Sequence, residues 1–403
     1  MNEKSVVKYT LDSCEKCMKC IKACPTSALS MVDNRIIIDG DLCINCGRCI
    51  RACHSKGLLA EGSPLTAIDD YDYTVCLVPA ALSSQCGSME KAEEMFANIK
   101  DLGFDEVIDI SDIEGAIMNE TFRLADDISK ESVITSFCPV VVQLIETKYP
   151  MLIDHFAPLR YASELAAMMV REQLSEREVG GGTVGIFYLC ECEAKLVLAK
   201  HPYDNPNREV DHAIAIVDIL PLIQKKNPNS ERPKLEFSRA GLQSCNTALI
   251  PQKPEYLMAD GSEKVENILD LAEFDLLKSF RLLYLFNCFN GCVGGHLMFG
   301  NGYLAKNNIH ALSPKDVKEP PELPFELLYC EDVIVEKKSQ VSVAEKMAFF
   351  KKVNEVLEQL PGLDCSACGM QTCRVMAESI IKGERKLDDC RILSAKEKSN
   401  DAE

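Results

Sequence analysis

Cysteines constrain this chain more than any other residue type. The chain has 403 residues and 21 cysteines, and sixteen of the cysteines form four groups of four. Two groups are compact runs near the N-terminus, one lies near the C-terminus, and one is scattered over about 155 residues between them. Groups of four thiols are typical of iron-sulfur clusters and of tetrahedral zinc sites. The fold must therefore bring each group of thiols to one point.

The two N-terminal runs share the spacing C-x2-C-x2-C-x3-C. The first contains Cys14, Cys17, Cys20 and Cys24, and the second contains Cys43, Cys46, Cys49 and Cys53. This is the spacing of bacterial two-cluster ferredoxins, in which the fourth cysteine of each run ligates the other cluster. It predicts one 4Fe-4S cluster on Cys14, Cys17, Cys20 and Cys53, and a second on Cys43, Cys46, Cys49 and Cys24. Zinc is the alternative metal for these cysteines, but the two interlocked four-cysteine runs make a zinc site the weaker interpretation.

Composition narrows the class of protein. Hydrophobic residues make up 47% of the chain and charged residues 26%, which is ordinary for a globular protein with two or three domains. The net charge of −18 argues against binding to nucleic acid or to anionic membrane surfaces. We find neither a secretory signal at the start MNEKSVVKYT nor an apolar run of 18 residues. Because so many thiols are reserved for metal, we expect a reducing cytoplasmic location without disulfides.

The pattern along the chain predicts three domains and a mixed α+β and α/β fold class. A ferredoxin-like domain occupies 1–62, and a domain with alternating strands and helices occupies 73–335, where the rhythm predicts parallel sheets. We expect this domain to have two lobes, the first with strands at 73–79, 106–110 and 132–137. The second lobe should begin after Gly182 with a strand at 183–189 and return to a strand at 281–286. A small helical module occupies 343–392.

The C-terminal module carries the third group of cysteines. The segment LPGLDCSACGMQTCRVMAESIIKGERKLDDC has the spacing C-x2-C-x4-C-x16-C, formed by Cys365, Cys368, Cys373 and Cys390. It resembles the small 4Fe-4S domain of electron-transport iron-sulfur proteins and of some hydrogenase-related sensors. The resemblance implies a third accessory 4Fe-4S cluster, with zinc again as the weaker alternative.

The fourth group lies at strand ends in the central domain, where α/β folds place functional sites. The segments are TSFCP with Cys138, FYLCECEAK with Cys190 and Cys192, and FNCFNGCVGG with Cys288 and Cys292. They resemble the three signature segments of the FeFe-hydrogenase H-domain, T-S-C-C-P, M-P-C-x-x-K and M-x-C-x-x-G-C-x-G-G. The similarity covers about residues 73–305.

The resemblance implies a cofactor, the H-cluster, which joins a 4Fe-4S cubane to a diiron unit with CO, cyanide and a dithiolate amine. Its cubane ligands would be Cys138, Cys192, Cys288 and Cys292, with Cys292 as the bridge. We prefer Cys192 to Cys190 because only Cys192 has a lysine three residues later. That residue, Lys195, matches the family lysine that hydrogen-bonds a cyanide; the alternative is a solvated helix lysine.

Several positions depart from the family pattern. Phe137 stands where the family has its proton-donating cysteine, and a benzyl group can neither donate nor accept a proton. Glu120 matches one of the two glutamates on the preceding helix, but the second position is Arg123. His296 is the titratable residue of the third segment, and it is a candidate proton relay or a structural histidine.

Two functions remain open at this stage. The first is a slow or atypical FeFe-hydrogenase that oxidises H2 or reduces protons and acts as a hydrogen or redox sensor. Its partner would be a ferredoxin-like redox protein or a signalling protein. The second is a non-catalytic electron-transfer protein whose central domain keeps its cubane without the diiron unit. Phe137 favours the second function, whereas Lys195 and Cys292 favour the first, which we prefer from the sequence.

Overall fold

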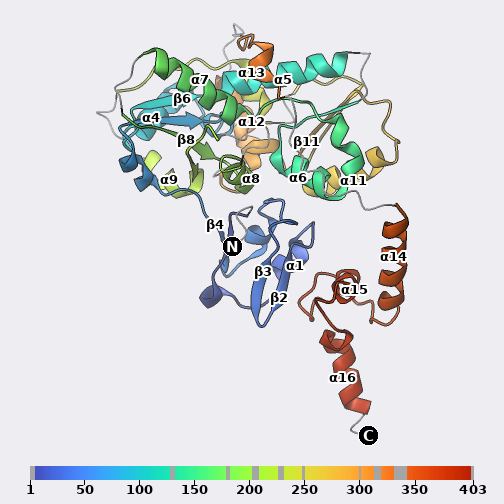
Figure 1. Ribbon diagram of the computed structural model, residues 1–403. Coiled ribbons are helices and arrows are strands. Elements are labelled where there is room, and N and C mark those ends of the chain that lie inside the picture. The colour runs from blue at the N-terminus through green and yellow to red at the C-terminus, as the bar shows by residue number, and fades with distance from the viewer. Residues whose placement is uncertain are drawn as a thin grey trace. The chain divides into compact units, whose positions relative to one another are not determined.

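The computed structural model describes residues 5–127, 132–177, 182–201, 208–225, 231–246, 250–298, 301–312, 319–330 and 343–400. The chain forms two compact units, one combining residues 1–60 with 336–403 and the other comprising 61–335 (Figure 1). The ferredoxin-like domain and the C-terminal module therefore share one unit. The predicted domain end at 335 lies outside the described residues.

The first unit contains two short hairpin-like sheets and five helices of α type within the described ranges. Strands β1 (Val7–Tyr9) and β4 (Leu58–Ala60) pair antiparallel, as do β2 (Leu29–Val32) and β3 (Arg35–Ile38). Asp33 and Asn34 join β2 to β3 and have positive φ angles of 48° and 62°, which suits a two-residue hairpin turn. The helices are α1 (Lys19–Ala23), α2 (Arg48–Ala52), α14 (Val343–Leu357), α15 (Cys373–Ile381) and α16 (Arg391–Asn400).

The second unit contains a four-stranded parallel sheet in the order β6-β5-β8-β9. Its strands are β5 (Tyr73–Val78), β6 (Glu106–Asp109), β8 (Val184–Cys190) and β9 (His212–Ala215). Helices α4 (Met89–Lys100) and α9 (Ile216–Ile223) pack against one another and against the sheet, whereas α7 (Ala162–Glu176) packs against β5 and α5 (Ser111–Asp126). Because β5 and β8 are buried on both faces, they read as continuous apolar runs.

A second parallel sheet has the order β10-β11-β7. Its strands are β7 (Val133–Ile134), β10 (Tyr256–Asp260) and β11 (Leu282–Phe286). The remaining helices of this unit are α3 (Ala80–Ser83), α6 (Pro139–Lys148), α8 (Glu193–Leu198), α10 (Arg239–Ser244), α11 (Ser262–Glu273), α12 (Gly302–Leu312) and α13 (Phe325–Leu328). Short 3-10 turns, including η5 (Gly291–Gly294), connect some of these elements.

The expected division of strands between the lobes is wrong. The strand expected to open the second lobe, β8, pairs with β5 in the first sheet, where Val75 lies opposite Ile186. The strand expected in the first lobe, β7, pairs with β11, where Val133 lies opposite Leu282. Short buried strands look alike in sequence, so their partners are decided by long-range packing. The exchange ties the two lobes together at the ends of β7, β8 and β11.

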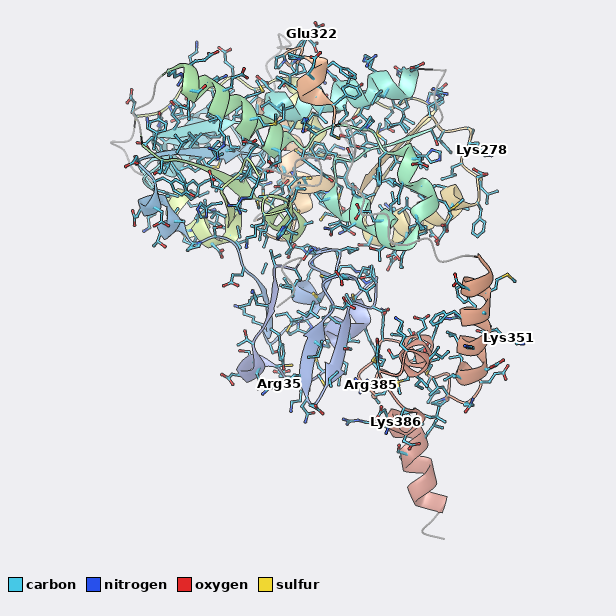
Figure 2. All side chains as sticks on the ribbon, viewed as in Figure 1. Arg35, Lys278, Glu322, Lys351, Arg385 and Lys386 are labelled. Atoms are coloured by element: carbon cyan, nitrogen blue, oxygen red, sulfur yellow. The ribbon has the colours of Figure 1, made fainter. Side chains whose placement is uncertain are left out.

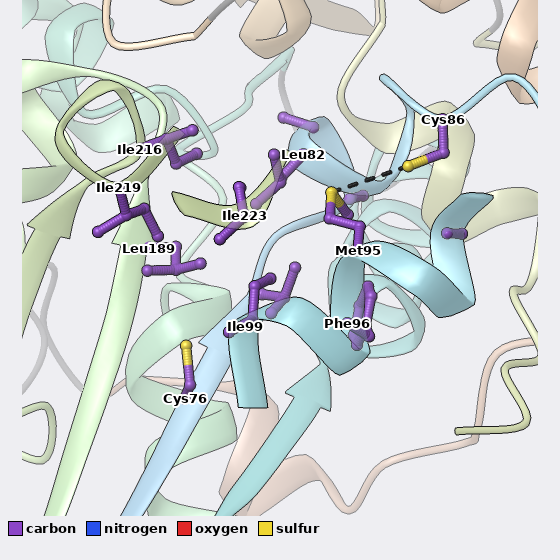
Figure 3. Packing of buried hydrophobic residues seen from close by; sticks show 14 of the residues in the cluster. Cys76, Leu82, Cys86, Met95, Phe96, Ile99, Leu189, Ile216, Ile219 and Ile223 are labelled. Atoms are coloured by element: carbon purple, nitrogen blue, oxygen red, sulfur yellow. Dashed lines mark hydrogen bonds between the residues drawn. The ribbon is translucent and has the colours of Figure 1, made fainter. Parts of the chain in front are cut away.

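The core of the four-stranded sheet lies between α4, α9 and one face of the strands (Figure 3). Alternate residues face this core, including Cys76 of β5 and Leu189 of β8, both fully buried. Figure 3 also shows Cys86 beside Met95, with the thiol 3.7 Å from the thioether sulfur. Cys76 and Cys86 are thus small core residues, which agrees with their apolar sequence contexts.

Candidate metal centres

The accessory cysteines line three separate cavities in the first unit. The first cavity is lined by Cys14, Cys17, Cys20 and Cys53. The second is lined by Cys24, Cys43, Cys46 and Cys49. The third is lined by Cys365, Cys368, Cys373 and Cys390. The structure therefore groups the fourth cysteine of each N-terminal run with the other run, and it brings the C-terminal quartet together as well.

Left-handed residues at repeated positions shape the N-terminal loops. Lys16 and Asn45 each follow the first cysteine of a run by two residues, with φ angles of 55° and 48°. After the last cysteine, the backbone turns to aim an amide at the thiol. The amide of Ala28 donates to Cys24 Sγ and that of Gly57 donates to Cys53 Sγ, both at 3.2 Å. Amide hydrogen bonds of this kind stabilise thiolate ligands and tune cluster potential.

Burial makes these thiols weak acids in the absence of a positive partner. It raises the pKa of Cys20 to about 11, with smaller contributions from Cys53, Cys14 and Cys17, and it raises the pKa of Cys46 to about 12. A buried apolar thiol becomes a thiolate when a metal displaces its proton. The cavities therefore fit metal clusters better than they fit reactive free cysteines.

The central quartet comes from three segments of the second unit. Cys138 precedes α6, Cys192 precedes α8, Cys288 follows β11, and Cys292 lies in η5. The Cys292 thiol lies close enough to Cys138 and Cys192 for electrostatic interaction with both, and Cys192 interacts in the same way with Cys288. The structure thus places the four cysteines in one region of the second unit, where Cys192 interacts with Cys288 and Cys292, and Cys292 with Cys138. Three His, Cys, Asp or Glu side chains do not converge on a single-ion site anywhere in the described ranges.

Cys190 points elsewhere, although it is only two residues from Cys192. Its Sγ lies 3.7 Å from the carbonyl oxygen of Tyr188, and its charged neighbours are Glu191, Lys195 and Lys200. Alternation along β8 explains the difference, because Cys190 is still in the strand whereas Cys192 has turned out of it. The arrangement is consistent with the preference for Cys192.

Lys195 is buried beside the quartet and is surrounded by oxygen atoms. Its Nζ lies 2.5 Å from Glu191 Oε1 and 3.9 Å from Glu114 Oε1, and it donates to the Tyr188 hydroxyl at 3.2 Å. Burial alone would lower the pKa of Lys195, but attraction to Glu191 and its other anionic neighbours outweighs burial and raises it. The ammonium is therefore kept charged by partners within the protein.

The two carboxyl groups around Lys195 are themselves buried. Glu114 and Glu191 are each only 1% exposed. Glu114 also accepts a hydrogen bond at 3.0 Å from the backbone amide of Ala80. Burial raises the pKa of Glu114 to about 8, although Lys195 pulls it down. Oε2 of Glu191 makes no hydrogen bond, so this carboxylate depends on Lys195 for its compensation.

The Phe137 ring lies beside the Lys195 ammonium, which also contacts Glu114, Glu191 and Tyr188. Its ring centroid lies 5.4 Å from Lys195 Nζ, and the ring packs edge-on against Phe286 at 5.8 Å. A cavity of about 20 Å³ adjoins Phe137, Tyr188, Lys195 and Glu114. That volume corresponds to about one water molecule.

Three segments of the chain match known protein families. Residues 13–57 match the 4Fe-4S dicluster domain, residues 73–249 match the iron only hydrogenase large subunit, C-terminal domain, and residues 360–392 match the family named FeS. The protein is FeFe-hydrogenase-like. Its N-terminal domain is ferredoxin-like, and the dicluster and FeS matches support 4Fe-4S clusters in the first unit.

Similar proteins of known structure are FeFe-hydrogenases. A variant of HydA1 from Chlamydomonas reinhardtii has 15% sequence identity and a TM-score of 0.46, and the match covers 64% of this chain and 87% of that chain. HydA(deltaEFG), studied for stepwise H-cluster assembly, has 15% identity and a TM-score of 0.45, covering 62% and 86%. MJ0119 of Methanocaldococcus jannaschii is 44% identical over 41 residues, and this match spans 10% of this chain and 18% of that protein.

The other proton-route candidates of this FeFe-hydrogenase-like protein lie apart from Lys195. Glu120 forms a surface network in which Arg123 donates to it at 2.5 Å and the Tyr329 hydroxyl also donates to it. His296 faces a different buried carboxylate, with its Nδ1 3.5 Å from Glu193 Oε2. Glu193 is 1% exposed and follows Cys192 directly.

The sequence interpretation missed Glu114, Glu191 and Glu193. Glu191 could have been recognised as a site residue from the sequence, because it stands between two cysteines at the end of a buried strand, where the family pattern M-P-C has proline. Glu114 carried a weaker signal, since it lies one helical turn before Ile117 and Met118 on the buried face of α5. Cys245 is a buried core residue, and its carbonyl oxygen accepts a hydrogen bond from the Cys292 amide at 2.9 Å. Across the described residues, none of the helices is long and apolar enough to cross a membrane.

Proposed function

We propose that this FeFe-hydrogenase-like protein is an oxidoreductase that carries electrons through four 4Fe-4S clusters without a diiron unit. The observation that carries the proposal is the pairing of Lys195 with Glu191 at 2.5 Å, inside a site where both carboxyl neighbours are 1% exposed. This reverses the preference that the sequence alone gave, because Lys195 was the residue that most favoured the diiron unit.

The four quartets fit cubane clusters. Each accessory quartet lines its own cavity, and two of the thiols receive backbone amide hydrogen bonds. In the central domain, Cys138, Cys192, Cys288 and Cys292 would hold the fourth cluster. Such clusters supply one-electron transfer. The protein itself contributes thiolates, amide donors and burial, and the exposed cysteines Cys17 and Cys365 mark where a redox partner protein could approach.

The pocket next to the central quartet does not fit the diiron unit. Cyanide ligands are anionic and need hydrogen-bond donors, but the Lys195 ammonium already donates to Glu191 and Tyr188. The Glu191 carboxylate therefore stands as an acceptor where the cyanide ligands need a donor. Placing a further anionic group beside the buried Glu191 carboxylate is strongly unfavourable.

The second candidate function is slow hydrogen oxidation or proton reduction, with a role in sensing. The interaction that favours it is the attraction between Lys195 and the Cys292 thiol, since Cys292 matches the bridging ligand of the family. In that case Phe137 would block proton transfer at the family's usual position. Turnover would then be slow, because a positioned acid or base typically contributes about 10²–10⁴-fold.

Infrared spectroscopy separates the two functions. The full chain would be produced with and without the FeFe-hydrogenase maturation proteins, purified without oxygen and analysed for iron. We expect the same iron content in both preparations and no CO or cyanide bands in either. Bands and hydrogen turnover that appear only after maturation would overturn the electron-transfer proposal and support the second function.

A variant with amides in place of the buried carboxyl groups tests whether these groups exclude the diiron unit. Glu191→Gln removes the negative charge that pairs with Lys195, and Glu114→Gln keeps the second carboxyl position neutral at every pH, while both substitutions keep the side-chain shapes. If these carboxylates exclude the diiron unit, matured protein with both substitutions should gain bands that the parent lacks. CO and cyanide bands of equal strength in the unsubstituted protein and in the double variant would show that these two side chains do not exclude the diiron unit.

A further inference from the structure

The C-terminal module covers the outer edge of a ferredoxin strand in the first unit. The amide of Met31 in β2 donates to the carbonyl oxygen of Gly369 at 2.8 Å. The carbonyl oxygen of Met31 accepts from the guanidinium of Arg385 at 2.8 Å, and Figure 2 labels Arg385 in this module. Both backbone groups of Met31 are therefore satisfied by the other module. An edge strand with unpaired groups is otherwise a site of unwanted association.

Gln371 connects the ligand loops of two cysteine quartets. It lies between Cys368 and Cys373 in the sequence, and its Nε2 donates to the carbonyl oxygen of Cys24 at 2.7 Å and to that of Lys22 at 3.3 Å. The Ser27 hydroxyl donates to its Oε1. One side-chain amide of the C-terminal loop thus holds the backbone at Lys22 and Cys24 and the side chain of Ser27.

Gly369 permits this close approach. It has a φ of +87°, and a Cβ atom at this position would lie 2.4 Å from the carbonyl oxygen of Met31. Real Cβ atoms do not come that close to backbone oxygen, so any other residue would push the two modules apart. The contact therefore requires glycine at position 369 for two separate reasons, backbone conformation and space.

We infer that the C-terminal module is a fixed partner of the ferredoxin-like domain, and that Gln371 is a positioning residue for the quartet of Cys24, Cys43, Cys46 and Cys49. Hydrogen bonding and solvent exposure around a cluster set its reduction potential. The amide of Gln371 presents the positive end of its dipole to the loop of Cys24. It should favour the more negative, reduced state of a cluster bound there. This part of the inference rests on the proposed function, because it needs the cluster.

Hydrogen exchange in the full chain tests the docking. Gly369→Ala should lower the protection of the Met31 amide by more than about tenfold, the scale of one lost hydrogen bond with local opening. Gly383→Ala is the matched control, since Gly383 also has a positive φ, +77°, but no atom within 4 Å of its Cβ position. Unchanged Met31 protection in Gly369→Ala would overturn the docking. Arg385→Ala provides a second variant that leaves the glycine backbone intact.

Redox titration followed by EPR tests the role of Gln371. We expect Gln371→Ala to lower the potential of the cluster on Cys24, Cys43, Cys46 and Cys49, and Gln371→Glu to lower it further because a donor becomes a negative acceptor. Gln359→Ala should leave it unchanged, since the amide of Gln359, just after α14, donates to the carbonyl oxygen of Glu355 in that helix at 3.0 Å. An unchanged potential in Gln371→Ala at full iron content would overturn the positioning role. Missing iron in the unsubstituted chain would instead contradict the proposed function.

Discussion

Lys195 sets the charge balance of the central domain. It is 6% exposed and lies between Glu191 and Glu114, so its removal leaves buried carboxylates without a cation. Breaking a buried ion pair by removing one partner typically costs about 3–5 kcal/mol. We expect Lys195→Met to destabilise the protein by that amount in urea unfolding. Adding Glu191→Gln should restore part of the loss, and equal stability of the single and double variants would contradict the pairing.

Glu114 makes stability depend on pH. Burial raises its pKa from 4.5 to about 8, so the folded protein keeps a proton that the unfolded chain releases between these values. The stability from this group is complete below pH 4.5 and is lost as the pH rises through about 8. The neighbours that share this environment are Lys195, Glu191 and Asp109.

Glu114→Gln should remove this dependence. Relative to the variant, the unsubstituted protein should lose roughly 2 kcal/mol of stability between about pH 6 and pH 9, because one pKa unit corresponds to about 1.4 kcal/mol. Urea midpoints of both proteins at each pH measure the difference. Parallel pH profiles for the two proteins would show that Glu114 titrates at an ordinary pKa.

The two neighbouring cysteines of the second segment should behave differently. Cys190→Ser should keep the iron of the central quartet, because the Cys190 thiol points to the carbonyl of Tyr188. Cys192→Ser should lose about four irons, because Cys192 lies with Cys288 and Cys292. Iron and sulfide analysis of both variants measures this. Loss of iron in Cys190→Ser alone would reverse the assignment.

At the scale of elements, local spacing could be predicted and pairing could not. The helix after Pro139 was expected because proline suits the first helical turn, and α6 does begin at Pro139. The stretch 211–224 has a helix-like sequence pattern but forms β9 and then α9, because His212–Ala215 pairs with β8. The pairing of β7 with β11 and of β8 with β5 joins residues more than a hundred positions apart, so no local sequence pattern predicts it.

Helices α5 and α10 approach closely enough to require glycine. A Cβ on Gly115 would lie 2.6 Å from the backbone nitrogen of Gly241. Both helices contribute to the site, since α5 carries Glu114 and α10 leads to Cys245, whose carbonyl oxygen accepts a hydrogen bond from the Cys292 amide. Separation of the helices would therefore move Cys292.

Gly115→Ala should destabilise the protein by about 1–3 kcal/mol, the usual cost of overpacking, and should lower the iron content of the central quartet. Gly87→Ala is the control, because its Cβ would meet only the Asn308 side chain, at an ordinary 3.5 Å. Urea unfolding and iron analysis on both variants test the expectation. A stable Gly115→Ala protein with full iron would show that α10 can shift without disturbing Cys292.

At the scale of the whole molecule, the quartets follow from the sequence more directly than their surroundings do. Twelve accessory cysteines could be grouped because each spacing is local and typical of one ligand geometry. Glu191 changes the interpretation of Lys195, yet its effect depends on how β8 and α8 place both side chains in the interior. The docking of Gly369 against Met31 joins segments that are more than three hundred residues apart, which no spacing rule predicts.

The crossed grouping of the N-terminal cysteines gives a prediction for the iron of the complete chain. Four cubanes correspond to about 16 irons, and each quartet should be lost as a unit of about four. Because Cys53 lines the cavity of Cys14, Cys17 and Cys20, Cys53→Ser should remove that cluster and spare the cluster on Cys43, Cys46 and Cys49. Cys24→Ser should do the reverse, since Cys24 lines the other cavity. EPR of the reduced variants, with iron and sulfide analysis, distinguishes the two losses. Loss of the cluster on Cys43, Cys46 and Cys49 in Cys53→Ser, or of the cluster on Cys14, Cys17 and Cys20 in Cys24→Ser, would contradict the crossed ligation.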